Sequence, residues 1–547
     1  MKLSDYVLKY METVVDSVFL VSGGGVMHIV DSIGKSNLTS ICTHHEQGAA
    51  LAAEGYARMK NDIGFCVVTT GPGGTNAVTG VAACWIDNIP IIVISGQVRK
   101  EIMIPKDNKY GLRQLGPQEI NIVDIVKPIT KYALTVEEPN SIKYHLQKAI
   151  YLAKSGKPGP VWLDVPLDVQ SAEIDEKSLE SFQIPEEKEC VIPTARIAAE
   201  LKRAQRPLLL IGQGIRLAKA EYLLAKFIEK TKINVISAMS GDDIVTYDYL
   251  HYLGPQGITG RKSANYAIDN CDVLLIVGTS MQLRQTSFDY KEFAKGKFII
   301  MADIDPAQLN KKTITPDISV CCDAKIFLEK MLEEKIILKR WDLLVEEIAY
   351  KTKSGYVDVY HFMEELNGKS DFPIVTANGM AAEVPHQAFK LRIGQRLITN
   401  TGLGEMGKGL PMAIGACIAN NKKPVICMEG DGSIMMNIHE LQTMIYHKLP
   451  LKIFIFNNGG YYSIRNTHNK FFGKVFAADE SSGLSLPNWK NLMAGWGINY
   501  ESISSEKDLH KLKNILESDG AIVCELVIDP HQEMIEKWTA NKYKEKI

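Results

Sequence analysis

The sequence predicts an α/β protein built from three doubly wound domains, each containing a parallel sheet. Short, continuously apolar runs alternate with helical patterns along the whole chain of 547 residues. Such runs are typical of parallel strands whose two faces are both covered by helices. Most of the runs are bounded by Gly, Pro, Asn or Asp, and at about 100–200 residues per domain the chain has room for about three domains.

The strand candidates fall into three parts of the chain. In order they are FCVVTT, PIIVIS and PVWLDV, then PLLLIG, INVISA, VLLIVG and FIIMADI, then PIVTAN, PVICMEG, LKIFIFNN and AIVCELVI. A charged, strand-poor segment at 174–188 and a segment at 332–354 that we expect to be helical separate the parts. We therefore place the domains at 1–175, 190–340 and 355–547. The first and third share a strand, glycine-loop and helix pattern without an evident sequence repeat.

Composition excludes several function classes. The formal net charge of -2 gives no electrostatic footprint for nucleic acid or an anionic membrane. No window offers the roughly 18 apolar residues of a membrane span, and acidic residues interrupt the first apolar stretch, unlike a signal peptide. The ten cysteines form no CxxC pair, which favours free thiols in a reducing compartment. We expect a cytoplasmic protein with no nucleic-acid or membrane partner.

An acid between two glycines follows the apolar run PVICM, in the stretch EGDGSIMM from Glu429 to Met436. A buried carboxylate without a partner costs several kcal/mol, and nothing basic lies nearby in sequence. A helical stretch and the strand LKIFIFNN follow, ending at Asn457 and Asn458. Because ligands collect at the carboxyl edge of a doubly wound sheet, Asp431 and Asn458 are expected to lie close together there.

A carboxylate, an amide oxygen and a loop carbonyl are hard oxygen ligands that suit Mg²⁺. Gly430 and Gly432 would let backbone N–H groups approach a phosphate. The alternative is a plain Asp helix cap and an Asn-Asn-Gly-Gly turn, which is the commoner reading of either piece alone. Together, at this spacing, they predict a metal that holds a phosphorylated cofactor.

The GDGS…NN pattern resembles the diphosphate- and metal-binding motif of thiamine-diphosphate enzymes. The resemblance implies thiamine diphosphate and Mg²⁺, with Asp431, Asn458 and the backbone carbonyl of Gly460 as metal ligands. It further implies a set of residues beside the cofactor: Asn378, Gly379, Gly404, Met406, Gly430, Asp431, Gly432, Ser433, Asn458 and Tyr461.

Further segments, among them THHEQGAALAAEGYAR, TTGPGGTNAVTG and TGLGEMGKGLPMAIGA, are most similar to the acetolactate synthase large-subunit group. That group has pyrimidine-binding, central and diphosphate-binding domains. The resemblance implies that Glu46 bonds N1′ of the cofactor's aminopyrimidine and that Gly404 and Met406 hold the pyrimidine ring. It also implies a homodimer or tetramer, because domains of two subunits share one site. Alone, Glu46 would more often be a solvated helix residue and Met406 ordinary core.

Two more residues match catalytic positions of that group. Gly25, in SGGGV, matches the loop that places an N–H near the substrate oxygen, although three glycines also make a tight turn. Gln97, in ISGQV, matches a glutamine near the substrate channel, and a buried amide that packs a loop is the alternative.

Many acetolactate synthases carry FAD in the central domain. Candidate contacts here are Gly212 in GQGIRL, the segment GPQGITG, Arg284 in GTSMQLRQTS and Asp303 in ADIDP. GQGIRL follows a strand, but Leu217 replaces the last glycine of GxGxxG. FAD is therefore possible, and the weak motif also argues against a nicotinamide or flavin oxidoreductase.

The cofactor motifs are intact, whereas segments that face the substrate depart from the group. The loop after ISGQV is longer, with Pro117 in place of a Phe; Leu167 replaces a Lys; and GGYYSIRNTHN follows the metal Asn. Retention of Glu46, Asp431 and Asn458 together argues against a dead regulatory subunit.

We expect a carboligase that decarboxylates a 2-oxo acid, pyruvate by preference, and transfers the acyl-anion unit to a second carbonyl. Alternatives are two-carbon transfer from pyruvate to a keto-sugar nucleotide, or simple decarboxylation. Arg99, Lys100, Arg113 and Arg465 could meet an acidic acceptor or be solvated surface charges.

Overall fold

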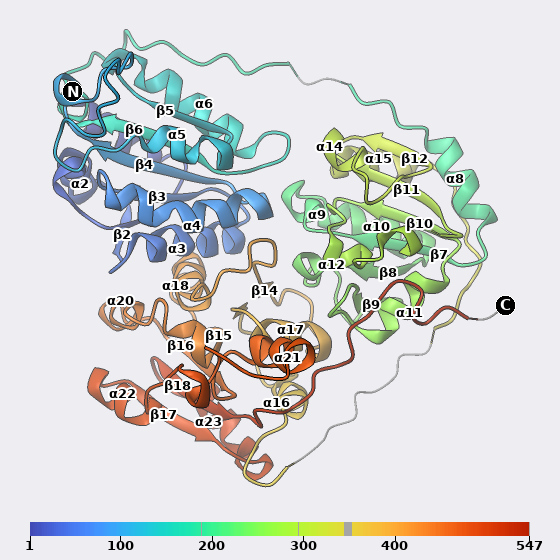
Figure 1. The fold of residues 1–547 in the computed structure, drawn as a ribbon. Coiled ribbons are helices and arrows are strands. Elements are labelled where there is room, and N and C mark those ends of the chain that lie inside the picture. Colours follow the sequence, from blue (N-terminus) through green and yellow to red (C-terminus); the bar gives the residue numbers. More distant parts are fainter. Residues whose placement is uncertain (187–188, 294, 344–352, 546–547) are drawn as a thin grey trace.

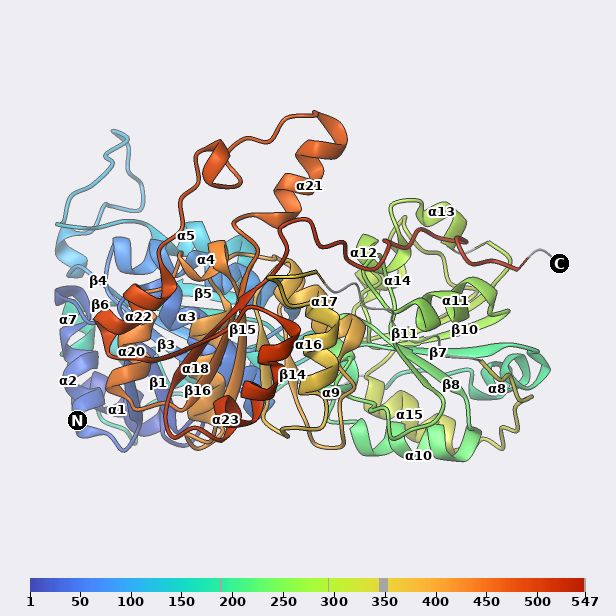
Figure 2. The same ribbon diagram turned by 90° about the horizontal axis from the view of Figure 1, so that it is seen from below.

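The computed structural model describes residues 1–186, 189–293, 295–343 and 353–545 (Figure 1). The chain forms three six-stranded sheets, and all strand pairs in them are parallel. Helices cover the sheets, and the first part lies above the third in Figure 1, with the central part to the right of both. In Figure 2 the first and third parts overlap in projection and the central part is again to the right. The predicted α/β class with three doubly wound parallel sheets is confirmed. None of the described helices is long and apolar enough to cross a membrane.

The first and third sheets have the same strand order. The first runs β2-β1-β3-β4-β6-β5 and the third β14-β13-β15-β16-β18-β17, so both read 2-1-3-4-6-5 when numbered from their own first strand. The structure thus reveals a duplicated topology that the sequence only suggested. The strands are β1 Ser17–Leu20, β2 Thr39–Cys42, β3 Gly64–Val68, β4 Ile91–Gln97, β5 Tyr132–Thr135, β6 Val161–Pro166, β13 Ile374–Thr376, β14 Leu397–Ile398, β15 Val425–Gly430, β16 Leu451–Asn457, β17 Asn499–Ile503 and β18 Ile522–Val527.

Helices of these two parts lie in the connections between the strands. They are α1 Leu3–Met11, α2 Met27–Lys35, α3 Glu46–Lys60, α4 Pro72–Asp87, α5 Ile122–Val126, α6 Ile142–Lys154, α7 Leu167–Gln170, α16 Val359–Leu366, α17 Met380–Ala388, α18 Gly409–Ala419, α19 Asp431–Ile434, α20 Glu440–Tyr446, α21 Tyr462–Phe471, α22 Trp489–Trp496 and α23 Leu512–Glu517.

The central sheet runs β12-β11-β10-β7-β8-β9, which is the order 3-2-1-4-5-6 of dinucleotide-binding folds read from one side. Its strands are β7 Pro207–Ile211, β8 Asn234–Ser237, β9 Tyr252–Pro255, β10 Val273–Val277, β11 Phe298–Asp303 and β12 Ile318–Cys321. Its helices are α8 Thr194–Arg203, α9 Gly214–Leu217, α10 Glu221–Thr231, α11 Lys262–Asn270, α12 Leu283–Thr286, α13 Tyr290–Phe293, α14 Pro306–Leu309 and α15 Ala324–Glu333.

Every apolar run proposed as a strand is one, and the strands missing from that set are mostly at sheet edges. The six edge strands are β2, β5, β9, β12, β14 and β17. Several of them are only partly buried, for example β2 and β5. An edge strand has one unpaired side and needs less apolar sequence, so the apolar-run criterion does not detect it. The interior strand β1 is also missing from the set.

The connections between the sheets differ in part from expectation. In the described part of residues 171–193 there is no helix and no strand beyond one isolated bridge, in accord with the charged break. The helix expected over 332–354 is wrong for residues 334–343, which follow the end of α15 in irregular structure. Residues 344–352 of that segment lie outside the described residues. The domain borders themselves stay a prediction.

Helices α3 and α18 join the first part of the chain to the third. They pack so closely that a Cβ on Gly55 would lie 2.1 Å from the Met412 carbonyl oxygen, and one on Gly415 would lie 1.8 Å from the Ala52 carbonyl oxygen. Glycine is therefore required at both crossings. This contact fixes α3, which begins at Glu46, against the element that precedes β15.

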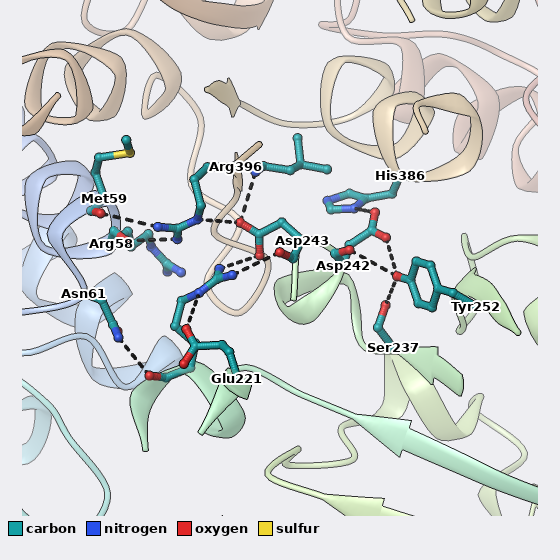
Figure 3. Close-up of polar contacts among 12 residues, drawn as sticks. Arg58, Met59, Asn61, Glu221, Ser237, Asp242, Asp243, Tyr252, His386 and Arg396 are labelled. Atoms are coloured by element: carbon teal, nitrogen blue, oxygen red, sulfur yellow. Dashed lines mark hydrogen bonds and ion pairs between the residues drawn. The ribbon is translucent and has the colours of Figure 1, made fainter. Parts of the chain in front are cut away.

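All three parts meet at a buried polar junction below the end of α3 (Figure 3). Arg396 donates to Asp243 Oδ2 at 2.7 Å and to the carbonyl oxygen of Arg58 at 3.0 Å. Arg216 donates to the other oxygen of Asp243, and Asn61 donates to the Arg216 carbonyl oxygen at 2.9 Å. Burial disfavours the charged form of Asp243, but the two guanidinium groups outweigh it and lower its pKa to about 2. The junction therefore remains ionised and anchors the C-terminal end of α3.

Candidate active site

The carboxyl edge of the third sheet gathers the residues predicted to bind a cofactor. Strands β13, β15 and β16 are neighbours in this sheet. Just beyond their carboxyl ends lie Asn378 and Gly379, then Asp431, then Asn458. The strand order reverses between β13 and β15, and ligands of doubly wound sheets bind at such a switch point. The expectation that Asp431 and Asn458 lie together is confirmed.

Asp431 is a buried carboxylate, 1% exposed, at the start of α19. Its Oδ2 accepts the backbone N–H of Asn458 at 3.1 Å and of Gly460 at 2.9 Å, and its Oδ1 accepts that of Gly432 at 2.7 Å. Burial raises the pKa of Asp431 to about 6, although the backbone hydrogen bonds oppose the shift. Within the described residues Asp431 forms no ion pair of 4.0 Å or less, and the charge of Arg465 lowers its pKa only as a smaller effect than burial. A cation from outside the chain would stabilise its charged form.

The groups around Asp431 fit a Mg²⁺ ion. The Asn458 side chain is 4% exposed beside it, and the Gly460 carbonyl accepts the N–H of Tyr462 at 3.0 Å while keeping a second lone pair. In the described parts of the chain no cluster of three or more His, Cys, Asp or Glu side chains could hold a metal. A mixed set of carboxylate, amide and carbonyl oxygens is therefore the candidate, and such hard oxygens are what Mg²⁺ prefers.

Arg465 neither faces an acidic acceptor substrate nor lies in solvent as a surface charge. It is 5% exposed and donates to the carbonyl oxygens of Asn458 at 2.7 Å and Gly459 at 3.0 Å, and to Asn458 Oδ1 at 3.2 Å. The guanidinium therefore holds the loop after β16 in shape. Both alternatives considered for Arg465 from the sequence are corrected by this burial.

The two glycines that flank Asp431 differ in whether they leave room for a side chain, and Tyr461 accounts for the difference. A Cβ on Gly432 would lie 2.4 Å from the ring of Tyr461. A Cβ on Gly430 would come no nearer than 3.7 Å to Ser433. The backbone at Gly432 therefore requires glycine because Tyr461 covers it, whereas the one at Gly430 does not.

The loop with Gly404 and Met406 is tied to this edge on two sides. Asn378 Nδ2 donates to the carbonyl oxygens of Gly404, at 2.9 Å, and of Glu405. From the other side, Ser433 Oγ accepts the N–H of Gly407 at 2.9 Å. The predicted cofactor residues of the third part of the chain thus form one constellation, in which Asn378 and Ser433 orient the loop.

Glu46 opens α3 at the corresponding edge of the first sheet. It is 8% exposed, so the solvated alternative is wrong. Asn76 Nδ2 donates to Glu46 Oε2 at 2.9 Å. Asn76 lies on α4, in the predicted glycine-rich segment, and was not itself singled out from the sequence; only the packing of α4 on α3 brings the two together. This amide holds the carboxyl while leaving Oε1 available.

Gly25 lies beside Glu46, at the switch point between β1 and β3. A Cβ on Gly25 would lie 1.9 Å from Thr70 Oγ1, and one on Gly73 would lie 2.8 Å from Thr69 Cγ2 and 3.6 Å from Glu46 Oε1. The hydroxyl groups of Thr69 and Thr70 are buried without a partner among the described residues. Two unsatisfied hydroxyls next to a carboxyl indicate a site built to receive a polar group.

Gln97 is engaged inside the first part of the chain. Its Nε2 donates to the Ile120 carbonyl oxygen at 3.0 Å and to Asp164 Oδ2 at 3.2 Å, and its Oε1 accepts the N–H of Val98 at 3.0 Å. The structure therefore gives this amide the loop-packing role that was the alternative, and its catalytic role stays a prediction.

The long loop after β4, which departs from the acetolactate synthase pattern, lies against the glycine-rich loop. A Cβ on Gly71 would lie 2.3 Å from the Gln118 carbonyl oxygen. Glu119 is buried and accepts the N–H groups of Leu115 at 2.9 Å and Gly116 at 3.0 Å, which shapes the loop. Arg99, Lys100 and Arg113 are exposed near it.

A separate cavity of 1070 Å³ lies at the carboxyl ends of β7, β10 and β11, between the central part and residues 86–88 and 154–158 of the first part. Arg284 and Asp303 line it, and burial raises the pKa of Asp303 to about 6. Gly212 packs behind it, since a Cβ there would lie 2.4 Å from the Gly278 carbonyl oxygen. Gln256 also lines the cavity, is 1% exposed, and has no partner among the described residues for either amide atom. Gln256 lies in GPQGITG, one of the segments expected to contact a flavin.

Glu46 and Asp431 are not joined within one chain. None of the hydrogen bonds or ion pairs among the described residues links Glu46 to Asp431, Asn458 or Met406. Glu46 follows β2 of the first sheet and Asp431 follows β15 of the third, so the two residues lie at the edges of different sheets of the same chain.

Comparison with known proteins agrees with this geometry. The chain matches the family descriptions "Thiamine pyrophosphate enzyme, N-terminal TPP binding domain" over residues 1–123, "central domain" over 194–331 and "C-terminal TPP binding domain" over 377–526. It is 31% identical to the acetolactate synthase isozyme 2 large subunit of Escherichia coli, over 94% of this chain and 93% of that protein. It is 31% identical to a probable acetolactate synthase large subunit of Methanocaldococcus jannaschii, over 97% of this chain and 92% of that protein. It is 30% identical to the acetolactate synthase large subunit of Cyanidium caldarium, over 94% of this chain and 91% of that protein.

Proposed function

Because the chain belongs to the thiamine-diphosphate-dependent enzymes of the acetolactate synthase large-subunit family, we propose that it decarboxylates pyruvate and transfers the two-carbon unit to a second carbonyl compound. The observation that carries the proposal is the buried Asp431, which accepts three backbone N–H groups and forms no ion pair of 4.0 Å or less among the described residues. That arrangement is suited to a metal-bound diphosphate at the switch point of the third sheet.

Asp431, Asn458 and the Gly460 carbonyl would hold Mg²⁺, and the backbone around Gly379 and Gly432 would face the diphosphate. When bound, thiamine diphosphate supplies the electron sink that decarboxylation of a 2-oxo acid requires. The loop held by Asn378 and Ser433 would place Met406 and Gly404 against the pyrimidine ring. These residues orient the cofactor and exclude water.

Glu46 would exchange a proton with N1′ of the pyrimidine ring. Its burial at the first turn of α3 and its hydrogen bond from Asn76 keep the carboxyl oriented. The neighbouring Thr69 and Thr70 hydroxyls and the backbone at Gly25 would meet substrate or cofactor oxygens. Catalysis by a positioned acid–base group of this kind contributes about 10²–10⁴-fold.

We infer a homo-oligomer, at least a dimer, in which Glu46 of one chain meets Asp431 of another. Two observations support it. Within one chain Glu46 follows β2 of the first sheet and Asp431 follows β15 of the third. Large apolar side chains are also exposed on α21 and just after it, namely Phe471, Phe472 and Phe476 at 68–72%. Exposed clusters of this size are typical of interaction surfaces.

The test is turnover of pyruvate by the full-length protein with thiamine diphosphate and Mg²⁺, followed by NMR of the products. We expect acetolactate to accumulate. Consumption of pyruvate only when an aldehyde or keto-sugar nucleotide is supplied would assign a different acceptor, which the departing loop at 99–119 makes worth testing. Acetaldehyde as the sole product would indicate a decarboxylase. No conversion of pyruvate under any of these conditions would contradict the proposal.

We propose that the central cavity binds FAD. The 3-2-1-4-5-6 strand order, a cavity of 1070 Å³ and the unpartnered Gln256 amide support a dinucleotide at this switch point.

We expect added FAD to raise the thermal midpoint of the protein, and Arg284→Ala to weaken FAD binding about 10-fold or more through loss of a charged contact. Arg206→Ala, in the same domain and paired to Glu545 away from the cavity, is the matched control. An unchanged midpoint with both FAD and ADP would contradict the proposal.

A further inference from the structure

The helix that presents Glu46 has no side-chain cap of its own. The N-cap residue of α3 is His45, whose backbone is extended and whose side chain accepts no N–H of the first turn. Helix N-termini normally find a Ser, Thr, Asp or Asn side chain for this purpose. Uncapped N–H groups next to a buried catalytic carboxyl would leave that carboxyl poorly held.

Glu440, in the third part of the chain, instead holds the two residues that lead into the helix. Its Oε1 accepts the backbone N–H of His44 and of His45, each at 3.1 Å. Thr443 Oγ1 donates to Glu440 Oε2 at 2.6 Å, which fixes the carboxylate. Glu440 is fully buried, so its carboxylate would be costly to retain without these bonds.

The first turn of α3 is shaped to admit this carboxylate. A Cβ on Gly48 would lie 2.4 Å from Glu440 Oε1, so only glycine leaves room for it. His439, the residue just before α20, also contacts the start of α3. Its ring lies edge to face with that of His45, with the ring centroids 5.8 Å apart. The contact is therefore complementary from both sides.

Glu440 also belongs to the segment that carries the predicted metal ligand. Helix α19 begins at Asp431, and α20, the next helix, begins at Glu440. At its other end α3 is anchored by Arg396 at the three-part junction (Figure 3). Residues of the third part thus hold both ends of the helix that bears Glu46.

We propose that Glu440 is a positioning residue: from the diphosphate-binding part of the chain it holds the backbone of His44 and His45, and so fixes the orientation of the adjoining Glu46. This rests on the proposed function, because it assumes that Glu46 exchanges protons with the cofactor. Glu440 contacts backbone N–H groups and acts through Glu46, and it need touch neither substrate nor cofactor.

The test compares Glu440→Ala, Glu440→Gln and Gly48→Ala in the full-length protein without cofactor, by hydrogen–deuterium exchange and mass spectrometry. We expect the amides of His44 and His45 to exchange about 10-fold faster or more in Glu440→Ala and Gly48→Ala, as for the loss of charge-assisted hydrogen bonds. Glu440→Gln keeps an acceptor oxygen and should restore most of the protection. Asp269→Asn is the control, because Asp269 is also a buried carboxylate that accepts backbone N–H groups, those of Asn541 and Tyr543 far from α3.

The second readout is exchange of the C2 proton of bound thiamine diphosphate at saturating cofactor. We expect it to slow about 10–100-fold in Glu440→Ala, with little change in cofactor affinity and partial recovery in Glu440→Gln. Unchanged amide exchange in both Glu440→Ala and Gly48→Ala would overturn the contact of Glu440 with the backbone of His44 and His45. Faster amides with wild-type C2 exchange would overturn the positioning role. Neither readout needs a 2-oxo acid. The role of Glu440 can therefore be decided even if the protein does not turn over pyruvate.

Discussion

Replacing Asp431 by alanine should abolish Mg²⁺-dependent binding of thiamine diphosphate. Asp431 is the buried carboxylate of the constellation at the carboxyl edge of the third sheet, and its backbone bonds aim it at Asn458 and Gly460. Removing a residue that only hydrogen-bonds to a metal ligand already lowers metal affinity about 10–100-fold. Removing the carboxylate ligand itself should therefore lower the affinity for Mg²⁺ and the cofactor by more than about 100-fold. A fluorescence titration of cofactor, with and without Mg²⁺, measures the effect.

Asp431→Asn separates loss of charge from loss of shape. The amide oxygen can still accept the N–H groups of Asn458 and Gly460, so the loop should keep its fold. The neutral group should nevertheless bind Mg²⁺ poorly. Wild-type cofactor affinity in both variants, with normal unfolding midpoints, would contradict the metal assignment.

The interior strands other than β1 were accessible from sequence because a parallel strand buried on both faces must be apolar throughout. The neighbouring positions of Asp431 and Asn458 were accessible for a related reason: one crossover helix joins their strands, and carboxyl ends of parallel strands share an edge. Both inferences use short-range pattern and connectivity. The edge strands escaped the same criterion because they are buried on fewer sides.

Contacts between elements distant in sequence were not accessible. Asn76 reaches Glu46 only through the packing of α4 on α3, and Glu440 reaches the first turn of α3 from almost the other end of the chain. Arg465 shows the same limit in reverse, since a cation that reads as surface in sequence is buried against the loop it stabilises. The sequence pattern gives residue types, while the packing of separate helices decides which of them meet.

Replacing Glu46 by glutamine should leave cofactor binding largely intact and slow exchange of the C2 proton of thiamine diphosphate by about 10²–10⁴-fold, the usual contribution of a positioned acid–base group. The amide matches the carboxyl in size, so it can keep the hydrogen bond from Asn76, but it cannot exchange a proton with N1′. Quenched-flow NMR of the bound cofactor measures the rate. Wild-type exchange in Glu46→Gln would contradict the assigned role.

Hybrid oligomers test whether the site lies between chains. When Glu46→Gln and Asp431→Ala chains carry different affinity tags and are co-purified, each dimer contains one chain of each kind. If Glu46 of one chain serves Asp431 of the other, one site combines both substitutions and the second has neither, so about half of the wild-type activity should return. If both residues of a site come from one chain, every site carries one substitution and the hybrid should be as inactive as its parents. We expect the first outcome, because Glu46 and Asp431 lie at the edges of different sheets of one chain.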